Sequence, residues 1–207
     1  KNLVSKAMVA ALLTEETSVL RNVPLIRDVD VVSELLRLHG AEVNYDQDAG
    51  TVTITPGQLH LPDPGKVDAL AGSSRIPILF CGPLLHQLGE AFIPDLGGCH
   101  IGDRPVDFHL KVLEDFGAIR DVQELGLHLV APTGLKARKV NLPYPSVGAT
   151  EQTLLAAVRA RGITELRGAA VEPEITDLIA ILQKMGALIT VDTDRTIHIE
   201  GVERLYG

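Results

Sequence analysis

The feature that most constrains the fold is a segment that recurs three times with the same ending. Each copy is an amphipathic stretch that ends in a Gly-Ala pair, at Gly40-Ala41, Gly117-Ala118 and Gly186-Ala187. The pairs lie roughly 70 residues apart, a spacing typical of a repeated structural unit. A glycine at such a point ends a helix in the left-handed conformation. The sequence therefore predicts three helices that stop in the same way.

Each Gly-Ala pair is followed by two strand-like runs, and the turn between them is rich in residues that favour a hairpin. The three predicted hairpins are Glu42–Tyr45 with Thr51–Thr55, Ile119–Val122 with Leu127–Val130, and Leu188–Val191 with Thr196–Ile199. A further strand-like run precedes each Gly-Ala helix, at Ser18–Val23, Ala91–Ile93 and Thr164–Leu166.

Ahead of these runs lie three apolar helices, Leu3–Leu13, Ile76–Leu88 and Ala149–Arg161, which have little polar face and are therefore predicted to be buried. Leading strands are predicted around Lys66–Leu70 and Lys139–Leu142, and the first unit lacks one because the sequence begins after it. The unit reads β-α-β-α-β-β three times, at about residues 1–60, 61–135 and 136–207. We predict one α/β (α+β) domain with buried helices inside and sheets outside, around a pseudo-threefold axis.

Composition narrows the classes of function. The formal net charge of −8 argues against a nucleic-acid surface, which needs a basic face. No apolar run approaches the length of a membrane span, and the first residues do not form a signal peptide. The two cysteines form no disulfide framework, and His86, His128 and His198 have no metal-site spacing. We expect a cytoplasmic protein that uses no metal and no cofactor, and that binds neither nucleic acid nor membrane.

Chemistry-bearing residues gather in the stretch 97–109. Its glycines allow a loop to bend close to a ligand, and Cys99 lies near Arg104, a setting that favours a reactive thiolate. Arg104-Pro105 then opens a helix, whose first N–H groups together with arginine can bind an anion. The same composition also fits a glycine-rich connector with an inert cysteine, and the residues alone leave both interpretations open.

The three apolar helices begin at comparable polar positions: Lys1-Asn2, Ser73-Ser74-Arg75, and Ser146–Thr150. Serine is a favoured N-cap, and a helix start beside a cation attracts anions. Any one of these starts is explained by capping alone. Three of them at equivalent positions, together with the Cys99 loop, favour a ligand that carries phosphate.

Other reactive groups have structural explanations. Cys81 lies in an apolar helix and is predicted to be a buried core thiol. Glu172 and Glu174 match a pair of acid-base carboxylates, but carboxylates at a helix start also favour the helix dipole. We therefore leave both glutamates out of the catalytic set.

Six blocks, in order along the whole chain, resemble the UDP-N-acetylglucosamine enolpyruvyl transferases. They are Lys1-Asn2 with its Ala/Leu-rich helix, Leu20–Asp30, the loop Gly97–His109 (GGCHIGDRPVDFH), Tyr144–Glu151 (YPSVGATE), Glu172–Leu178 (EPEITDL) and Thr193–Val202. The loop and the YPSVGATE block are the most specific. Two departures are Tyr144, where the family usually has Phe, and Val112, where Gly is common.

The resemblance implies transfer of the enolpyruvyl group of phosphoenolpyruvate to the 3′-hydroxyl of UDP-N-acetylglucosamine, with release of phosphate, at the start of peptidoglycan synthesis. On this carry-over Cys99 is the general acid toward the methylene carbon, Lys1 and Arg104 hold the phosphate of phosphoenolpyruvate, and Asn2 meets the sugar. The residues expected to bind the UDP-sugar are Arg75, Arg104, Pro105, Val106, Asp107, Phe108, His109, Tyr144, Pro145, Ser146, Val147 and Gly148.

The family has two threefold domains, and this chain resembles one of them, so the expected partners are the two substrates and the second domain. Two alternatives stay open. One is a shikimate-type enolpyruvyl transferase with 3-phosphoshikimate as acceptor, from which the Cys99 loop and Tyr144–Glu151 point away. The other is a ligand-binding half that does not turn over by itself.

Overall fold

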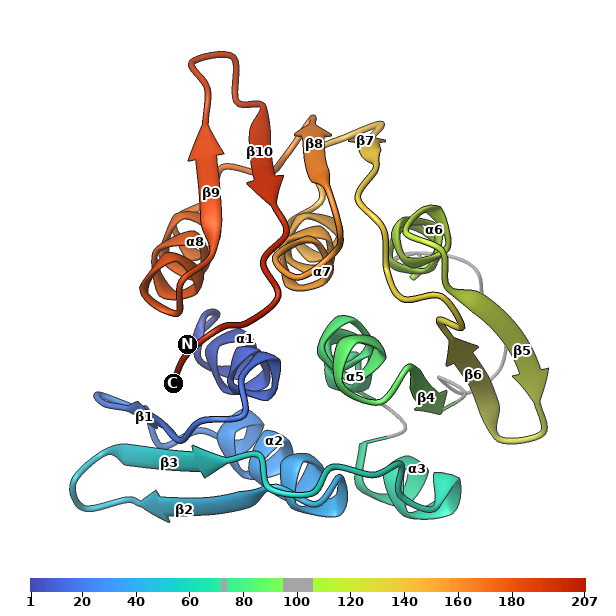
Figure 1. Ribbon diagram of the computed structural model, residues 1–207. Helices are drawn as coiled ribbons and strands as arrows, with labels where there is room; N and C mark the ends of the chain where they lie inside the picture. Colours follow the sequence, from blue (N-terminus) through green and yellow to red (C-terminus); the bar gives the residue numbers. More distant parts are fainter. Residues whose placement is uncertain (72–73, 95–105) are drawn as a thin grey trace.

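The fold is built from three sheets arranged around a group of helices (Figure 1). The computed structural model describes residues 1–71, 74–94 and 106–207. Its strands are β1 (Ser18–Leu20), β2 (Glu42–Asp46), β3 (Thr51–Thr55), β4 (Glu90–Pro94), β5 (Ile119–Gln123), β6 (Gly126–Val130), β7 (Lys139–Asn141), β8 (Ile163–Arg167), β9 (Leu188–Val191) and β10 (Ile197–Glu200). The sheet orders are β1-β3-β2, β4-β6-β5 and β7-β8-β10-β9.

All strand pairs in these sheets are antiparallel except the β7–β8 pair, which is parallel. Each predicted hairpin is present, as β2–β3, β5–β6 and β9–β10, and each predicted run that precedes a Gly-Ala helix supplies the strand beside the second hairpin strand. The predicted leading strand at Lys139–Leu142 is confirmed by β7. The hairpins and their partners therefore follow the repeat.

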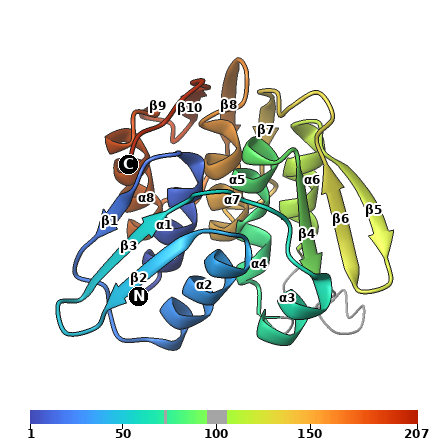
Figure 2. The same ribbon diagram turned by 60° about the horizontal axis from the view of Figure 1, so that its bottom comes forward.

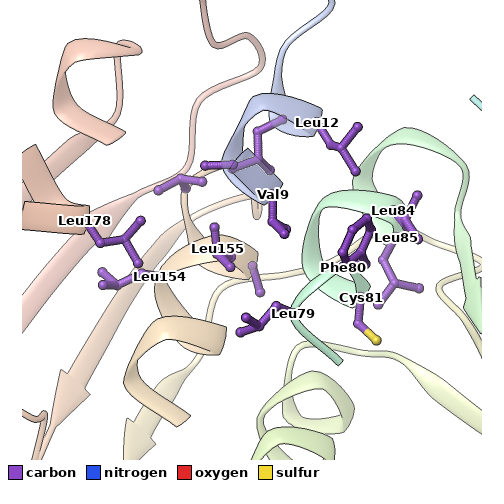
Figure 3. Close-up of a cluster of buried hydrophobic side chains, with 14 of the residues drawn as sticks. Val9, Leu12, Leu79, Phe80, Cys81, Leu84, Leu85, Leu154, Leu155 and Leu178 are labelled. Carbon is purple, nitrogen blue, oxygen red and sulfur yellow. The ribbon is translucent and has the colours of Figure 1, made fainter. Parts of the chain in front are cut away.

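The centre of the molecule is occupied by α1 (Val4–Ala10), α5 (Cys81–Gln87) and α7 (Val147–Ala157), with the sheets outside them (Figure 1). Every residue of α7 from Ala149 to Ala157 is buried, so this helix has no solvent-facing side. Figure 3 shows Val9, Leu79 and Leu155 gathered between the central helices. The prediction of buried apolar helices is confirmed.

Three hydrogen bonds from side chains to backbone carbonyls tie the central helices together. Because the carbonyls lie at or near helix ends, a side chain from a neighbouring helix supplies the partner that the helix itself lacks. The bonds are Gln87 Nε2 to Leu12 O (2.8 Å), His86 Nε2 to Ala156 O (2.6 Å) and Arg159 Nη1 to Leu13 O (3.2 Å). They join the first, second and third helices in a closed ring.

The outer helices α2 (Arg27–Leu38), α6 (Asp107–Asp115) and α8 (Pro173–Lys184) all end in the same backbone motif. The three glycines that follow have positive φ angles of 97°, 109° and 104° at Gly40, Gly117 and Gly186. The alanine after each glycine donates to a carbonyl five residues earlier: Ala41 to Leu36 (3.0 Å), Ala118 to Leu113 (2.9 Å) and Ala187 to Leu182 (2.9 Å). This is the Schellman motif, which confirms the predicted helix ends.

These glycines provide a matched stability test. Gly117→Ala is expected to lower the free energy of unfolding by about 1–2 kcal/mol, because a side chain disfavours positive φ. Gly40→Ala is expected to lower it further, because its Cβ would lie 2.3 Å from the Gln58 carbonyl oxygen, whereas the nearest atom at Gly117 is 3.7 Å away. Urea unfolding of both variants measures the difference, and equal losses would contradict the steric argument.

The predicted strand at Lys66–Leu70 is wrong, because this segment lies in α3 (Pro64–Ala71). Pro64 suits the first turn of a helix, and the Asp63 carboxylate accepts from the Gly65 N–H at 2.7 Å. Val67 and Ala71, four residues apart, are the buried residues of the helix, as on a helical face.

The predicted helix Ile76–Leu88 is divided into α4 (Ile76–Leu79) and α5 around Phe80. Pro83 has no N–H to bond the Leu79 carbonyl, which accounts for the break. Within the ranges described, no helix is both long and apolar enough to cross a membrane, and no three His, Cys, Asp or Glu side chains form a group that could hold a metal ion.

Candidate functional site

A cavity of about 400 Å³ lies where several helices begin. Its described lining combines two cations, two carboxylates, a histidine and small polar groups: Ser5, Lys6, Asp28, Ser74, Arg75, Ile76, Ile78, Leu79, His109, Gly148 and Glu151. These residues come from α1, α2, the segment before α4, α4 itself, α6 and α7. Figure 2 shows α4 lying beyond α5 toward the side of the molecule that carries the N-terminus.

Of the three predicted helix starts, the start of α7 has a side-chain cap among the described residues, and those of α4 and α1 do not. Ser146 Oγ accepts a hydrogen bond from the Ala149 N–H at 3.2 Å, and Ser74 Oγ accepts from the Ile76 N–H at 3.1 Å. At the start of α1, no side chain among the described residues caps the helix, and Lys6 Nζ instead donates to the Asn2 carbonyl at 2.7 Å. A serine cap thus fixes the start of α7 beside the cavity, whereas the Ser74 bond lies one residue ahead of the α4 N-cap position.

His109, Gly148 and Arg75, three of the residues expected to bind the UDP-sugar, share this cavity. The His109 ring lies so close to the start of α7 that a Cβ at Gly148 would be 2.6 Å from His109 Nε2. Burial and, to a smaller extent, the Arg75 cation lower the pKa of His109 to about 4. The imidazole is therefore neutral near pH 7, and its buried Nδ1 has no hydrogen-bond partner in the described part of the chain.

The two predicted UDP-sugar segments also meet through their aromatic rings. Phe108 contacts Tyr144 edge to face, with ring centroids 5.1 Å apart and an interplanar angle of 84°. Tyr144 is half exposed. Val106 precedes α6 and Asp107 begins it, while Pro145 and Val147 flank the Ser146 cap of α7. The structure thus brings the described parts of both segments together.

Lys6 and Glu151 are cavity residues that were not included in the predicted site. Lys6 Nζ lies 3.5 Å from Glu151 Oε2, and the Glu151 side chain is only 4% exposed. Burial raises the pKa of Glu151 to about 7, against the lowering effect of the Lys6 cation. A signal was present in the sequence, because Glu151 is the one acidic residue between Val147 and Ala157 and Lys6 interrupts an apolar helix.

Other predicted site residues are either not described by the structure or not among the described lining of the cavity. Cys99, Arg104 and Pro105 lie outside the described residues, as does Ser73. Lys1 and Asn2 are exposed and precede α1, and neither is part of the described cavity lining.

The structure supports the structural explanations given for Cys81, Glu172 and Glu174. Cys81 is fully buried, and burial strongly raises the pKa of its thiol, so this cysteine is an unreactive core residue. Glu172 lies at the N-cap of α8 and Glu174 in its first turn, as expected for carboxylates that favour the helix dipole.

The repeated sheets around buried helices, with a polar cavity at the helix starts, define the enolpyruvyl transferase fold. The family model of EPSP synthase (3-phosphoshikimate 1-carboxyvinyltransferase) matches residues 1–207, and the chain belongs to this family. Among curated relatives, the UDP-N-acetylglucosamine 1-carboxyvinyltransferases of Protochlamydia amoebophila and Gluconacetobacter diazotrophicus are each 45% identical to it, over 100% of this chain and 45% and 49% of their own length. The chain thus spans about half the length of the curated relatives it matches.

Solved structures support the fold. The enolpyruvyl transferase NikO from Streptomyces tendae matches 98% of this chain and 47% of its own with a TM-score of 0.83 at 22% identity. EPSP synthase from Acinetobacter baumannii matches 100% of this chain and 46% of its own with a TM-score of 0.78 at 20% identity. At these identities the similarity supports the fold and does not indicate the substrate.

Proposed function

We propose that the chain is one domain of a UDP-N-acetylglucosamine 1-carboxyvinyltransferase, which transfers the enolpyruvyl group of phosphoenolpyruvate to the 3′-hydroxyl of the sugar and releases phosphate. The observation that carries the proposal is 45% identity to proteins of that name over the whole of this chain. The cavity supports it, because Arg75, His109 and Gly148 from the proposed sugar-binding set line it together.

In this proposal the described residues bind and orient the acceptor. Arg75 supplies a cation beside the cavity, and the exposed Tyr144 ring next to Phe108 offers an aromatic surface. The capped start of α7 presents backbone N–H groups at Val147 and Gly148. Neutral His109 fixes the distance between α6 and α7 because its ring lies against Gly148.

The chemical step is assigned to Cys99, Lys1 and Arg104 from the family resemblance. We assign Cys99 as the general acid toward the methylene carbon of phosphoenolpyruvate, and Lys1 and Arg104 as the groups that hold its phosphate. The rest of the site belongs to a second domain of the whole enzyme. The product of this reaction would enter peptidoglycan synthesis in the cytoplasm.

An amide NMR titration with UDP-N-acetylglucosamine tests the binding part. We expect the shifts to be confined to Arg75, Val106–His109 and Tyr144–Gly148 among the described residues, at concentrations up to about millimolar because half of the site is absent. The same titration with 3-phosphoshikimate tests the shikimate-type acceptor and is expected to leave the spectrum unchanged. A well-dispersed spectrum that does not respond to the UDP-sugar would overturn the proposal.

Arg75→Gln is expected to weaken UDP-N-acetylglucosamine binding about tenfold or more, because a charged donor to a phosphate group is lost. Arg138→Gln is the matched control, since Arg138 is an exposed arginine outside the cavity lining and its loss is expected to leave the affinity unchanged. The dissociation constants come from the NMR titrations. Equal affinities of the two variants would remove Arg75 from the binding set.

Phosphate release distinguishes a competent domain from a ligand-binding half. The 207-residue chain is expected to bind the UDP-sugar without releasing phosphate from phosphoenolpyruvate, and mixing it with the complementary domain is expected to restore release. Release by this chain alone would show that the second domain is not needed for turnover.

A further inference from the structure

The Glu151 carboxylate is a buried charged group of the cavity that lacks a hydrogen-bond donor at one of its oxygens. Its side chain is 4% exposed, and its Oε2 atom is buried and accepts no hydrogen bond from the described residues. The closest cation, Lys6 Nζ, lies 3.5 Å away, beyond ordinary hydrogen-bond distance. A buried carboxylate whose one ion-pair partner among the described residues lies at 3.5 Å depends strongly on any charge that enters its surroundings.

Lys6 has two described partners, the Glu151 carboxylate and the Asn2 carbonyl. Besides facing Glu151, it donates to the Asn2 carbonyl at 2.7 Å, and it is partly exposed to solvent. A partly exposed ammonium group can turn toward a newly arrived anion at small cost, whereas the buried carboxylate cannot reach water to replace its counter-ion. The two members of the pair therefore respond differently when the cavity fills.

The charged and titratable groups that line the cavity with Glu151 or act on its charge are Lys6 of α1, Asp28 of α2, Arg75 before α4, His109 of α6 and Glu174 of α8. Lys6 favours the ionised carboxylate, and Glu174 opposes it. His109 stays neutral near pH 7. Burial outweighs Lys6 and holds the pKa of Glu151 at about 7, so both protonation states are populated before any ligand binds.

We propose that Glu151 takes up a proton from solvent when an anionic ligand enters the cavity. The ligand adds a second negative charge in a site of low dielectric constant and competes for the Lys6 counter-ion, and both effects disfavour ionised Glu151. The carboxylate becomes a carboxylic acid, and no other bond forms or breaks. Glu151 thereby acts as a positioning residue that keeps the cation of the empty cavity neutralised and gives up its charge to the ligand.

The proposal rests on the proposed function only for its ligand, UDP-N-acetylglucosamine. This ligand is a suitable probe because its diphosphate does not titrate near neutral pH, whereas a phosphate monoester such as phosphoenolpyruvate loses its last proton near pH ~6. Any proton taken up when the UDP-sugar binds is therefore bound by a group of the protein and not by the ligand.

Calorimetric titration of the whole chain in buffers of different ionisation enthalpy tests the proposal. At about pH 7.5, the observed binding enthalpy is expected to change with buffer ionisation enthalpy with a slope that reports uptake of up to about one proton. Glu151→Gln is expected to bind the ligand with a slope near zero, because the amide has the same shape and does not titrate. Asp28→Asn, the same change at an exposed carboxylate of the same cavity, is expected to keep the slope.

A second variant and a direct readout complete the test. Lys6→Met is expected to raise the pKa of Glu151, so that the carboxyl is already protonated and the slope falls. Carboxyl NMR of Glu151 is expected to show its titration midpoint rising when the UDP-sugar is added.

The outcomes separate the two proposals. Measurable binding with zero slope in the unmodified chain would overturn proton uptake and leave the proposed function standing. A slope that persists in Glu151→Gln would overturn the assignment to Glu151. No binding by the folded chain would overturn the proposed function, and the proton-uptake proposal with it.

Discussion

Gly201→Ala is expected to lower the free energy of unfolding by about 3 kcal/mol or more, since its added methyl group has no space. An ideal Cβ at this position would lie 1.6 Å from the Ala160 carbonyl oxygen and 2.5 Å from its carbon. The segment cannot withdraw freely, because the Gly201 N–H donates to Gly162 O at 2.9 Å and the Val202 N–H donates to Val158 O at 3.0 Å. Relief of the overlap must therefore break backbone hydrogen bonds beyond the end of α7.

Gly89→Ala is a control that adds a methyl group without a steric overlap. Gly89 has a φ of +74° and no neighbouring atom within 4 Å of the added Cβ, so only the backbone strain of about 1–2 kcal/mol is expected. Urea unfolding followed by circular dichroism measures both variants. If Gly201→Ala were no less stable than Gly89→Ala, the close approach of Gly201 to Ala160 would be wrong.

Glu151→Gln is expected to make the chain more stable above neutral pH. Burial raises the pKa of Glu151 from its ordinary 4.5 to about 7, so the folded chain holds this proton more tightly than the unfolded chain. The stability that results is present below the ordinary pKa and is lost as the pH rises to the folded pKa. The loss totals about 3 kcal/mol, from about 1.4 kcal/mol for each pKa unit. Glutamine cannot ionise, so the variant escapes this loss.

Two buried histidines change the stability with pH in the opposite direction, so their effect must be separated from that of Glu151. The pKa values of His86 and His109 are lowered to about 4, chiefly by burial, so both destabilise the fold as the pH falls from 6.5 toward about 4. Both histidines are present in the two proteins, so the difference between unmodified chain and variant isolates Glu151. Urea midpoints at about pH 5 and about pH 8 are expected to show that difference growing by about 2 kcal/mol in favour of the variant. Parallel pH curves would contradict the raised pKa.

The repeat was predictable because its signals are local. A Gly-Ala pair after an amphipathic run contains the whole Schellman motif, and the three motifs appear at Gly40, Gly117 and Gly186. Ser146 caps the start of α7 for the same local reason. The strand predicted at Lys66–Leu70 was wrong. It was inferred by analogy with the third unit, whereas the local Asp63-Pro64 pair begins a helix there.

The cavity was predictable only in part. The resemblance selected Arg75, His109 and Gly148, and the fold places all three around one cavity, while their roles remain predictions. Lys6 and Glu151 were missed because their significance depends on facing each other across two helices that are far apart in the sequence. Periodicity indicates which helices are buried, but it does not indicate which buried polar side chains meet.

The closed ring of central helices has a consequence for synthesis on the ribosome. Met8, Val9, Leu12 and Leu13 are fully buried, and α1 packs against α8, which lies far along the chain. Thr14 Oγ1 donates to Leu205 O at 2.9 Å, so the first unit gains this contact only after residue 205 has been synthesised. A nascent chain that has exposed α1 and α5 but not yet α7 and α8 presents an apolar surface of the kind that holding chaperones bind. Assembly of the core is thus expected to follow synthesis rather than to proceed unit by unit along the emerging chain.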